Sequence, residues 1–152
     1  MAQNGSILVV DDELGPRESL RMILKPLYEV HTAADGREAL QFIGSEKVDL
    51  VTLDLKMPGI SGIEVLREIK KLRNDIEVVI ITGYGTLANA QDAIRYGAVD
   101  FISKPFNVAD IVAIISKSFE RRNLNLEIRN ISQKIKELNS MEENQKDEVE
   151  IN

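Results

Sequence analysis

The chain has 152 residues, a net charge of −6 and no cysteine. This length suits one domain of ordinary size, and an acidic balance without a basic stripe argues against direct nucleic-acid binding. Without cysteine, disulfides and thiolate metal sites are excluded. No apolar run approaches the length of a membrane span, and residues 1–5 lack the features of a secretory signal. The expected location is therefore the cytoplasm.

Short apolar segments and helical patterns alternate along most of the chain. The segments of strand length lie at residues 6–10, 28–32, 48–55, 76–82 and 99–103. Apolar residues at helical spacing follow them at residues 16–27, 36–43, 63–72, 87–96 and 108–119. The expected apolar faces of these helices include Leu27, Leu72, Leu87 and Ile94. Asp35 is expected to be the N-cap of the second helix. This alternation predicts an α/β fold, a flavodoxin-like doubly wound parallel sheet with strand order 2-1-3-4-5.

The last part of the chain has a different pattern. Its apolar residues Leu124, Ile128, Ile131, Ile135 and Leu138 are spaced four, three, four and three apart, which is a heptad seam of about two heptads. This helix either forms a homodimer through Leu124–Leu138 or packs back on its own domain. We expect a domain at 1–121, a helical linker or coiled coil at 122–139, and an acidic disordered tail at 140–152.

Polar residues follow four of the predicted strands. Asp11 and Asp12 follow the first strand, Asp54 lies near the end of the third, Thr82 ends the fourth and Lys104 follows the fifth. The carboxyl ends of parallel strands meet at one edge, so these residues are expected to converge. Three carboxylates need a cation, and hard oxygen ligands select Mg²⁺. The lysine and the hydroxyl suit a phosphoryl group, with the Asp54 carboxylate as its acceptor.

The same stretches carry a family resemblance. The segments Val9–Glu13, Leu53–Gly59, Ile81–Gly83 and Lys104–Phe106 closely resemble the motifs of the receiver domain of two-component response regulators. The resemblance covers roughly residues 5–121. It implies a phosphoacceptor switch, with self-directed phosphotransfer and slow autodephosphorylation as its only expected catalysis.

The resemblance also implies roles for single residues. Asp54 would accept a phosphoryl group from a histidine kinase, and Lys104 would pair with that group. Asp12 would ligate Mg²⁺ directly, Asp11 would act largely through water, and the backbone carbonyl of Lys56 would be a further ligand.

A switch is implied by the resemblance as well. Thr82 and Phe101 would form the switch pair and alter the surface around the fourth helix and fifth strand, to control an output partner or dimerisation. The peptide bond before Pro105 would be cis. The sequence around Thr82 looks most like receivers of nitrogen-regulation (enhancer-binding) activators, whose ATPase and DNA-binding domains are not present, so the chain is either a stand-alone regulator or a piece of a longer protein.

Two alternative functions compete with this interpretation. An aspartate-nucleophile phosphatase of the haloacid-dehalogenase type also uses strand-end Asp, Thr and Lys with Mg²⁺. That class has a second acid two residues after the nucleophile, where this chain has Lys56. A binding module with a vestigial pocket is the other alternative, and the complete set of acids argues against it.

Overall fold

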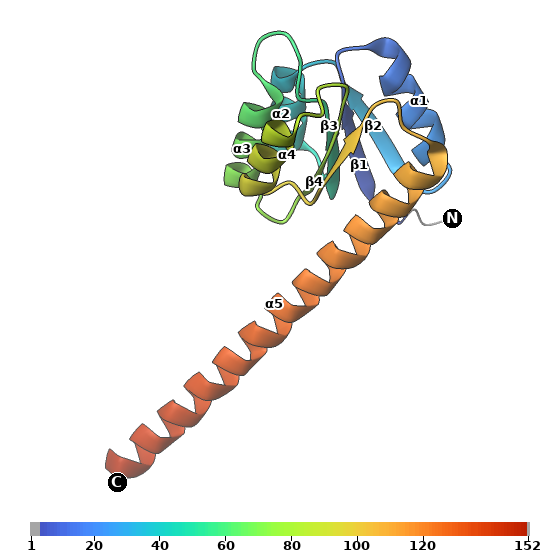
Figure 1. Ribbon diagram of the computed structural model, residues 1–152. Helices are drawn as coiled ribbons and strands as arrows, with labels where there is room; N and C mark the ends of the chain where they lie inside the picture. Colours follow the sequence, from blue (N-terminus) through green and yellow to red (C-terminus); the bar gives the residue numbers. More distant parts are fainter. Residues whose placement is uncertain (1–3, 152) are drawn as a thin grey trace. The chain divides into compact units, whose positions relative to one another are not determined.

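The computed structural model describes residues 4–151, with side chains described through residue 146. Strands and helices alternate along it (Figure 1). The strands are β1 (Ser6–Val10), β2 (Glu29–Ala33), β3 (Leu50–Leu53), β4 (Glu77–Thr82) and β5 (Asp100–Ser103). The helices are α1 (Leu14–Leu24), α2 (Gly36–Ser45), α3 (Gly62–Leu72), α4 (Leu87–Arg95) and α5 (Val108–Ile151).

The strands form one parallel five-stranded sheet in the order β2-β1-β3-β4-β5, which confirms the predicted flavodoxin-like fold. The central strands are buried on both sides, as their continuous apolar sequences require. Val10 lies opposite Leu53, and Leu53 lies opposite Ile80. This register brings the carboxyl ends of β1, β3 and β4 to the same edge.

Helices cover both faces of the sheet. Successive side chains of each strand point to opposite sides, so the apolar residues of one strand are divided between two cores. Leu8 and Val10 of β1 belong to the core formed with α2, α3 and α4. Ile7 and Val9 belong to the second core, formed with α1 and the first part of α5. Each face of the sheet therefore has its own apolar layer.

Side-chain caps fix where α2, α3 and α4 begin after their loops. Asp35 accepts a hydrogen bond from the backbone N–H of Glu38 at 2.9 Å, which confirms it as the predicted N-cap of α2. Ser61 caps α3 and Thr86 caps α4 in the same way. The α4 cap lies four residues after Thr82, so it anchors the loop beside the expected site.

Four residues expected on apolar helix faces are exposed instead. Leu27 is 41% exposed because α1 ends at Leu24, and Leu72 is 57% exposed as the last residue of α3. Leu87 and Ile94 of α4 are 76% and 52% exposed. Only Ala93 of α4 is buried, so this helix packs on the domain through one small residue and leaves its larger apolar side chains in solvent.

The chain divides into two compact units, Met1–Phe119 and Glu120–Asn152, and α5 contributes to both. The predicted fifth helix ended at residue 119, whereas α5 continues to Ile151. Residues 140–151 are therefore helical instead of a disordered tail, because their Glu, Gln, Lys and Met are strong helix formers. The boundaries at 121 and 139 stay predictions, and the parts of these predictions that concern residues 1–3 and 152 lie outside the described residues.

None of the helices in the described part of the chain combines the length and apolarity that a bilayer crossing requires.

Gly62 allows α3 to start against the backbone that carries Asp54. An added Cβ there would lie 2.4 Å from the Asp54 carbonyl oxygen and 2.5 Å from the Leu55 Cα, both of them backbone atoms. We expect Gly62→Ala to lower the free energy of unfolding by about 1–3 kcal/mol, measured by urea denaturation. Gly44→Ala is the matched control, since its Cβ meets nothing within 4 Å in α2. It should raise stability by about 0.5–1 kcal/mol, and equal effects of the two substitutions would contradict this account.

Candidate functional site

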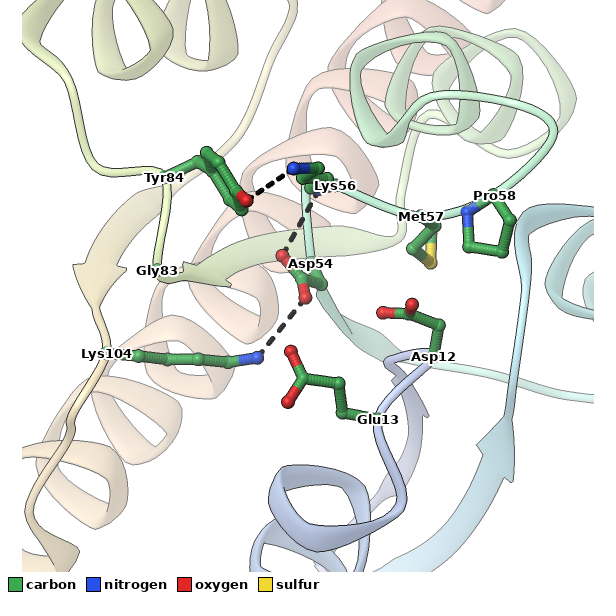
Figure 2. Close-up of a pocket in the computed structure, with 9 residues that line it drawn as sticks. All are labelled: Asp12, Glu13, Asp54, Lys56, Met57, Pro58, Gly83, Tyr84 and Lys104. Atoms are coloured by element: carbon green, nitrogen blue, oxygen red, sulfur yellow. Dashed lines mark hydrogen bonds and ion pairs between the residues drawn. The ribbon is translucent and has the colours of Figure 1, made fainter.

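Asp54 lies directly after β3 and is almost fully buried, with 4% of its surface exposed. Its backbone N–H donates to the Val10 carbonyl at 3.0 Å, which ties its position to the end of β1. Both carboxylate oxygens have partners. Oδ1 accepts from the Thr82 hydroxyl at 2.6 Å. Oδ1 also accepts from the Lys56 backbone N–H at 3.3 Å, and Oδ2 accepts from Lys104 Nζ at 3.2 Å (Figure 2).

Asp11 and Asp12 meet Asp54 at this edge of the sheet, as the sequence predicted. One carboxylate oxygen from each of the three lies within 4.8 Å of the others. Asp11 is buried, whereas Asp12 is exposed. Figure 2 shows the carboxylates of Asp12 and Glu13 turned toward Asp54 and Lys104. Such a set of oxygen donors could hold a hard metal ion.

Lys104 bridges the two buried carboxylates of this cluster. Its ammonium group lies 2.6 Å from Asp11 Oδ2 and 3.2 Å from Asp54 Oδ2. Burial by itself lowers the pKa of Lys104, but the hydrogen bonds and negative charges of Asp11 and Asp54 outweigh it, so the net pKa is raised. One ammonium group offsets one of three carboxylate charges, so the cluster keeps an excess of negative charge that suits a divalent cation.

Lys56 and Tyr84 face each other across the mouth of the site. Lys56 Nζ lies 2.5 Å from the Tyr84 hydroxyl and 4.3 Å from the centre of its ring. The hydrogen bond to Tyr84 is the main cause that raises the pKa of Lys56. This pair could not be predicted from the sequence, because the residues are 28 positions apart and neither belongs to a periodic pattern. The backbone carbonyl of Lys56 stays a predicted metal ligand.

A cleft of about 490 Å³ opens above the acid cluster (Figure 2). Its lining combines the charged residues with a short apolar wall. The lining residues are Asp12, Glu13, Asp54, Lys56, Met57, Pro58, Gly83, Tyr84 and Lys104. The cleft therefore gives a small anionic group access to Asp54 from solvent.

Thr82 and Phe101, the predicted switch pair, differ in burial. Thr82 is fully buried, and its hydroxyl also accepts a hydrogen bond from the backbone N–H of Tyr84 at 3.2 Å. Phe101 is half-buried and packs against the core on the α2–α4 side. A Cβ at Gly85 would lie 3.5 Å from the Phe101 ring and 2.4 Å from the Ser103 hydroxyl, so the loop after Thr82 lies close to β5. The Lys104–Pro105 peptide bond is cis.

The fold and the acidic cluster together define a flavodoxin-like α/β protein with a polar site at the carboxyl edge of its sheet. Comparison with known families gives a match to the response regulator receiver domain over residues 7–125. The chain thus belongs to the receiver domain family of two-component signalling.

Individual relatives are of mixed kinds. The chain is 39% identical to sporulation initiation phosphotransferase F of Bacillus subtilis, over 75% of this chain and 93% of that protein. It is 32% identical to the regulatory protein AtoC of Escherichia coli, over 84% of this chain but only 28% of the relative. The crystal structure of NtrX from Brucella abortus in complex with ATP superposes with a TM-score of 0.80 at 36% identity, over 85% of this chain and 30% of that one. The comparisons therefore support the receiver family and leave the nitrogen-regulation subtype a prediction.

The raised pKa of Lys104 predicts a dependence of stability on alkaline pH. Its ion pairs stabilise the fold below about pH 10.4, the ordinary lysine pKa, and this contribution is lost as the pH rises through the higher folded-state value. We expect the free energy of unfolding to fall less steeply above about pH 10.4 in Lys104→Gln than in the unsubstituted protein.

Urea denaturation at a series of pH values measures this difference. Burial also raises the pKa of Tyr28, so the ionisation of Tyr28 lowers the free energy of unfolding at alkaline pH in every variant. The difference between variants therefore reports Lys104. Lys117→Gln, at an exposed position of α5, is the control and should follow the unsubstituted protein. Parallel curves for all three proteins would show that the ion pairs of Lys104 do not stabilise the fold.

Proposed function

We propose that this chain is a phosphoacceptor switch, in which Asp54 receives a phosphoryl group from a histidine kinase. The observation that carries the proposal is the surroundings of the Asp54 carboxylate. Thr82 and Lys104 contact its two oxygens, Asp11 and Asp12 lie beside it, and a cleft open to solvent is lined by Asp12 and Asp54. Membership of the receiver family supports the same role.

The residues around Asp54 suit the transfer chemically. An Asp54 oxygen forms a bond to phosphorus as the bond from phosphorus to the kinase histidine nitrogen breaks, and the imidazole keeps that electron pair. Lys104 pairs with an oxygen of the transferred group, and the Thr82 hydroxyl donates to another. Positioning and charge neutralisation of this kind are the main requirements of phosphoryl transfer.

Mg²⁺ is the cofactor that fits the donor set. Asp11, Asp12, Asp54 and the Lys56 carbonyl would hold it, since they offer only hard oxygen ligands and an excess of negative charge. The bound ion would neutralise charge on the phosphoryl oxygens. Asp12, whose side chain is exposed, would ligate the ion directly, and Asp11, which is already paired with Lys104, would act through water.

The switch would run from Thr82 to the surface of α4 and β5. A phosphoryl group on Asp54 offers the Thr82 hydroxyl new hydrogen-bond acceptors. The Thr82 hydroxyl also accepts a hydrogen bond from the backbone N–H of Tyr84, so a shift of Thr82 would move the loop that contains Tyr84. Phe101, beside this loop, would follow it inward. The surface so altered would control an output partner or self-association in the cytoplasm, in the manner of the nitrogen-regulation receivers.

Phosphorylation from a small-molecule donor tests the acceptor. With acetyl phosphate and Mg²⁺, intact-mass analysis should find one added phosphoryl group on the unsubstituted protein and none on Asp54→Asn, which keeps the shape but loses the nucleophile. Asp92→Asn removes an exposed carboxylate of α4 and should be labelled normally. Equal labelling of Asp54→Asn would refute the assignment. Sustained turnover of para-nitrophenyl phosphate would instead favour a phosphatase.

Binding of Mg²⁺ can be measured separately through stability. An ion that binds only the folded state adds about 2.7 kcal/mol to the free energy of unfolding at a concentration one hundred times its Kd. We expect this gain in the unsubstituted protein and in Asp92→Asn, and its loss in Asp12→Asn, which removes the charge of an exposed side chain. A gain retained by Asp12→Asn would mean that the ion binds elsewhere.

A further inference from the structure

An apolar stripe runs along the second compact unit of the chain, residues 120–152. Leu124, Ile128, Ile131, Ile135 and Leu138 are 56%, 53%, 58%, 52% and 61% exposed. All five lie on α5, and their spacing of four, three, four and three residues places them on one side of the helix. A single helix cannot bury its own stripe, so these side chains need another surface to cover them.

We infer that a second copy of this chain covers the stripe, and that the two helices form a parallel two-stranded coiled coil over residues 124–138. In this heptad Ile128 and Ile135 occupy the a positions, and Leu124, Ile131 and Leu138 occupy the d positions. β-branched residues at a with leucine at d favour two parallel strands, and only the central d position departs from that pattern.

The flanking residues are compatible with this parallel pairing. The e positions are the uncharged Asn125, Ser132 and Asn139. In a parallel pair each g residue faces the e residue five positions later in the other copy, so Glu127 meets Ser132 and Lys134 meets Asn139. No like charges oppose each other at these e and g positions.

The antiparallel arrangements are less favourable. In one antiparallel register, Glu127 of one copy lies opposite Lys134 of the other. In that register Leu138 of each copy lies opposite Arg121 of the other, so the two end layers have no apolar pair. The next antiparallel register brings Lys134 opposite Lys134 of the second copy. An exposed ion pair adds little stability, whereas the parallel register buries all five apolar layers.

The seam also has clear ends. The heptad positions on either side hold Arg121 and Glu142, so the coiled coil is limited to about two heptads. A seam this short produces a dimer whose population depends on protein concentration. Because the interface contains none of the cleft residues, it stands apart from the phosphoacceptor proposal.

Sedimentation equilibrium of the full chain over a wide concentration range tests the pairing. The unsubstituted protein should pass from one chain mass to two as concentration rises, and Ile128→Lys/Ile135→Lys should remain at one. Asn130→Lys/Gln133→Lys adds the same charge at exposed c and f positions of the same helix and should still dimerise. Asp54→Asn should dimerise as well, so a failure of the acceptor assignment leaves this result intact.

Cysteine cross-linking tests the orientation, since the chain has no cysteine of its own. Under air oxidation, Leu124→Cys should form a disulfide-linked dimer, because equivalent d positions meet only in the parallel register. Gln133→Cys, on the outer face, should remain uncrosslinked. A single-chain mass at all concentrations, a three-chain mass, dimers of Ile128→Lys/Ile135→Lys, or no cross-linking of Leu124→Cys would each overturn the inference.

Discussion

The bridge from Lys104 to two buried carboxylates is the interaction on which the site depends. Asp11 and Asp54 are almost fully buried side by side, and without a cation between them their charges would repel strongly. The ammonium group stabilises both, and the third acid, Asp12, lies exposed beside them. The folded protein thus holds a partly neutralised acidic cluster, stable by itself and still attractive to a divalent ion.

This cluster exists because of the register of the sheet. Val10 lies opposite Leu53, so the residues that follow them, Asp11 and Asp54, meet at the edge. The same register at β4 and β5 places Thr82 beside Ser103, one residue before Lys104. The apolar strands can shift only by exposing a buried face, so burial of the two cores also fixes the geometry of the polar edge.

The sequence was enough to predict the strand order and the meeting of Asp11, Asp12 and Asp54, because buried parallel strands and residues at their ends leave a strong pattern. The pair of Lys56 and Tyr84 could not be predicted, because loop side chains choose partners by local geometry that no periodicity reports. The prediction that Leu87 and Ile94 lie on the apolar face of their helix was wrong for a different reason. Their spacing is typical of a buried helix face, yet α4 packs on the domain mainly through Ala93.

Helix α5 carries two separate apolar patterns, and only one of them is explained by the receiver fold. Ile111, Ile115 and Phe119 belong to the core beneath the sheet. The step of five residues from Phe119 to Leu124 breaks that pattern, and a strict heptad begins. The family match ends at residue 125, so nearly all of the heptad lies beyond what a receiver domain requires. The proposed association between chains rests on this stripe of exposed leucine and isoleucine, because an apolar surface that the domain does not use for its own folding is typical of an interaction site.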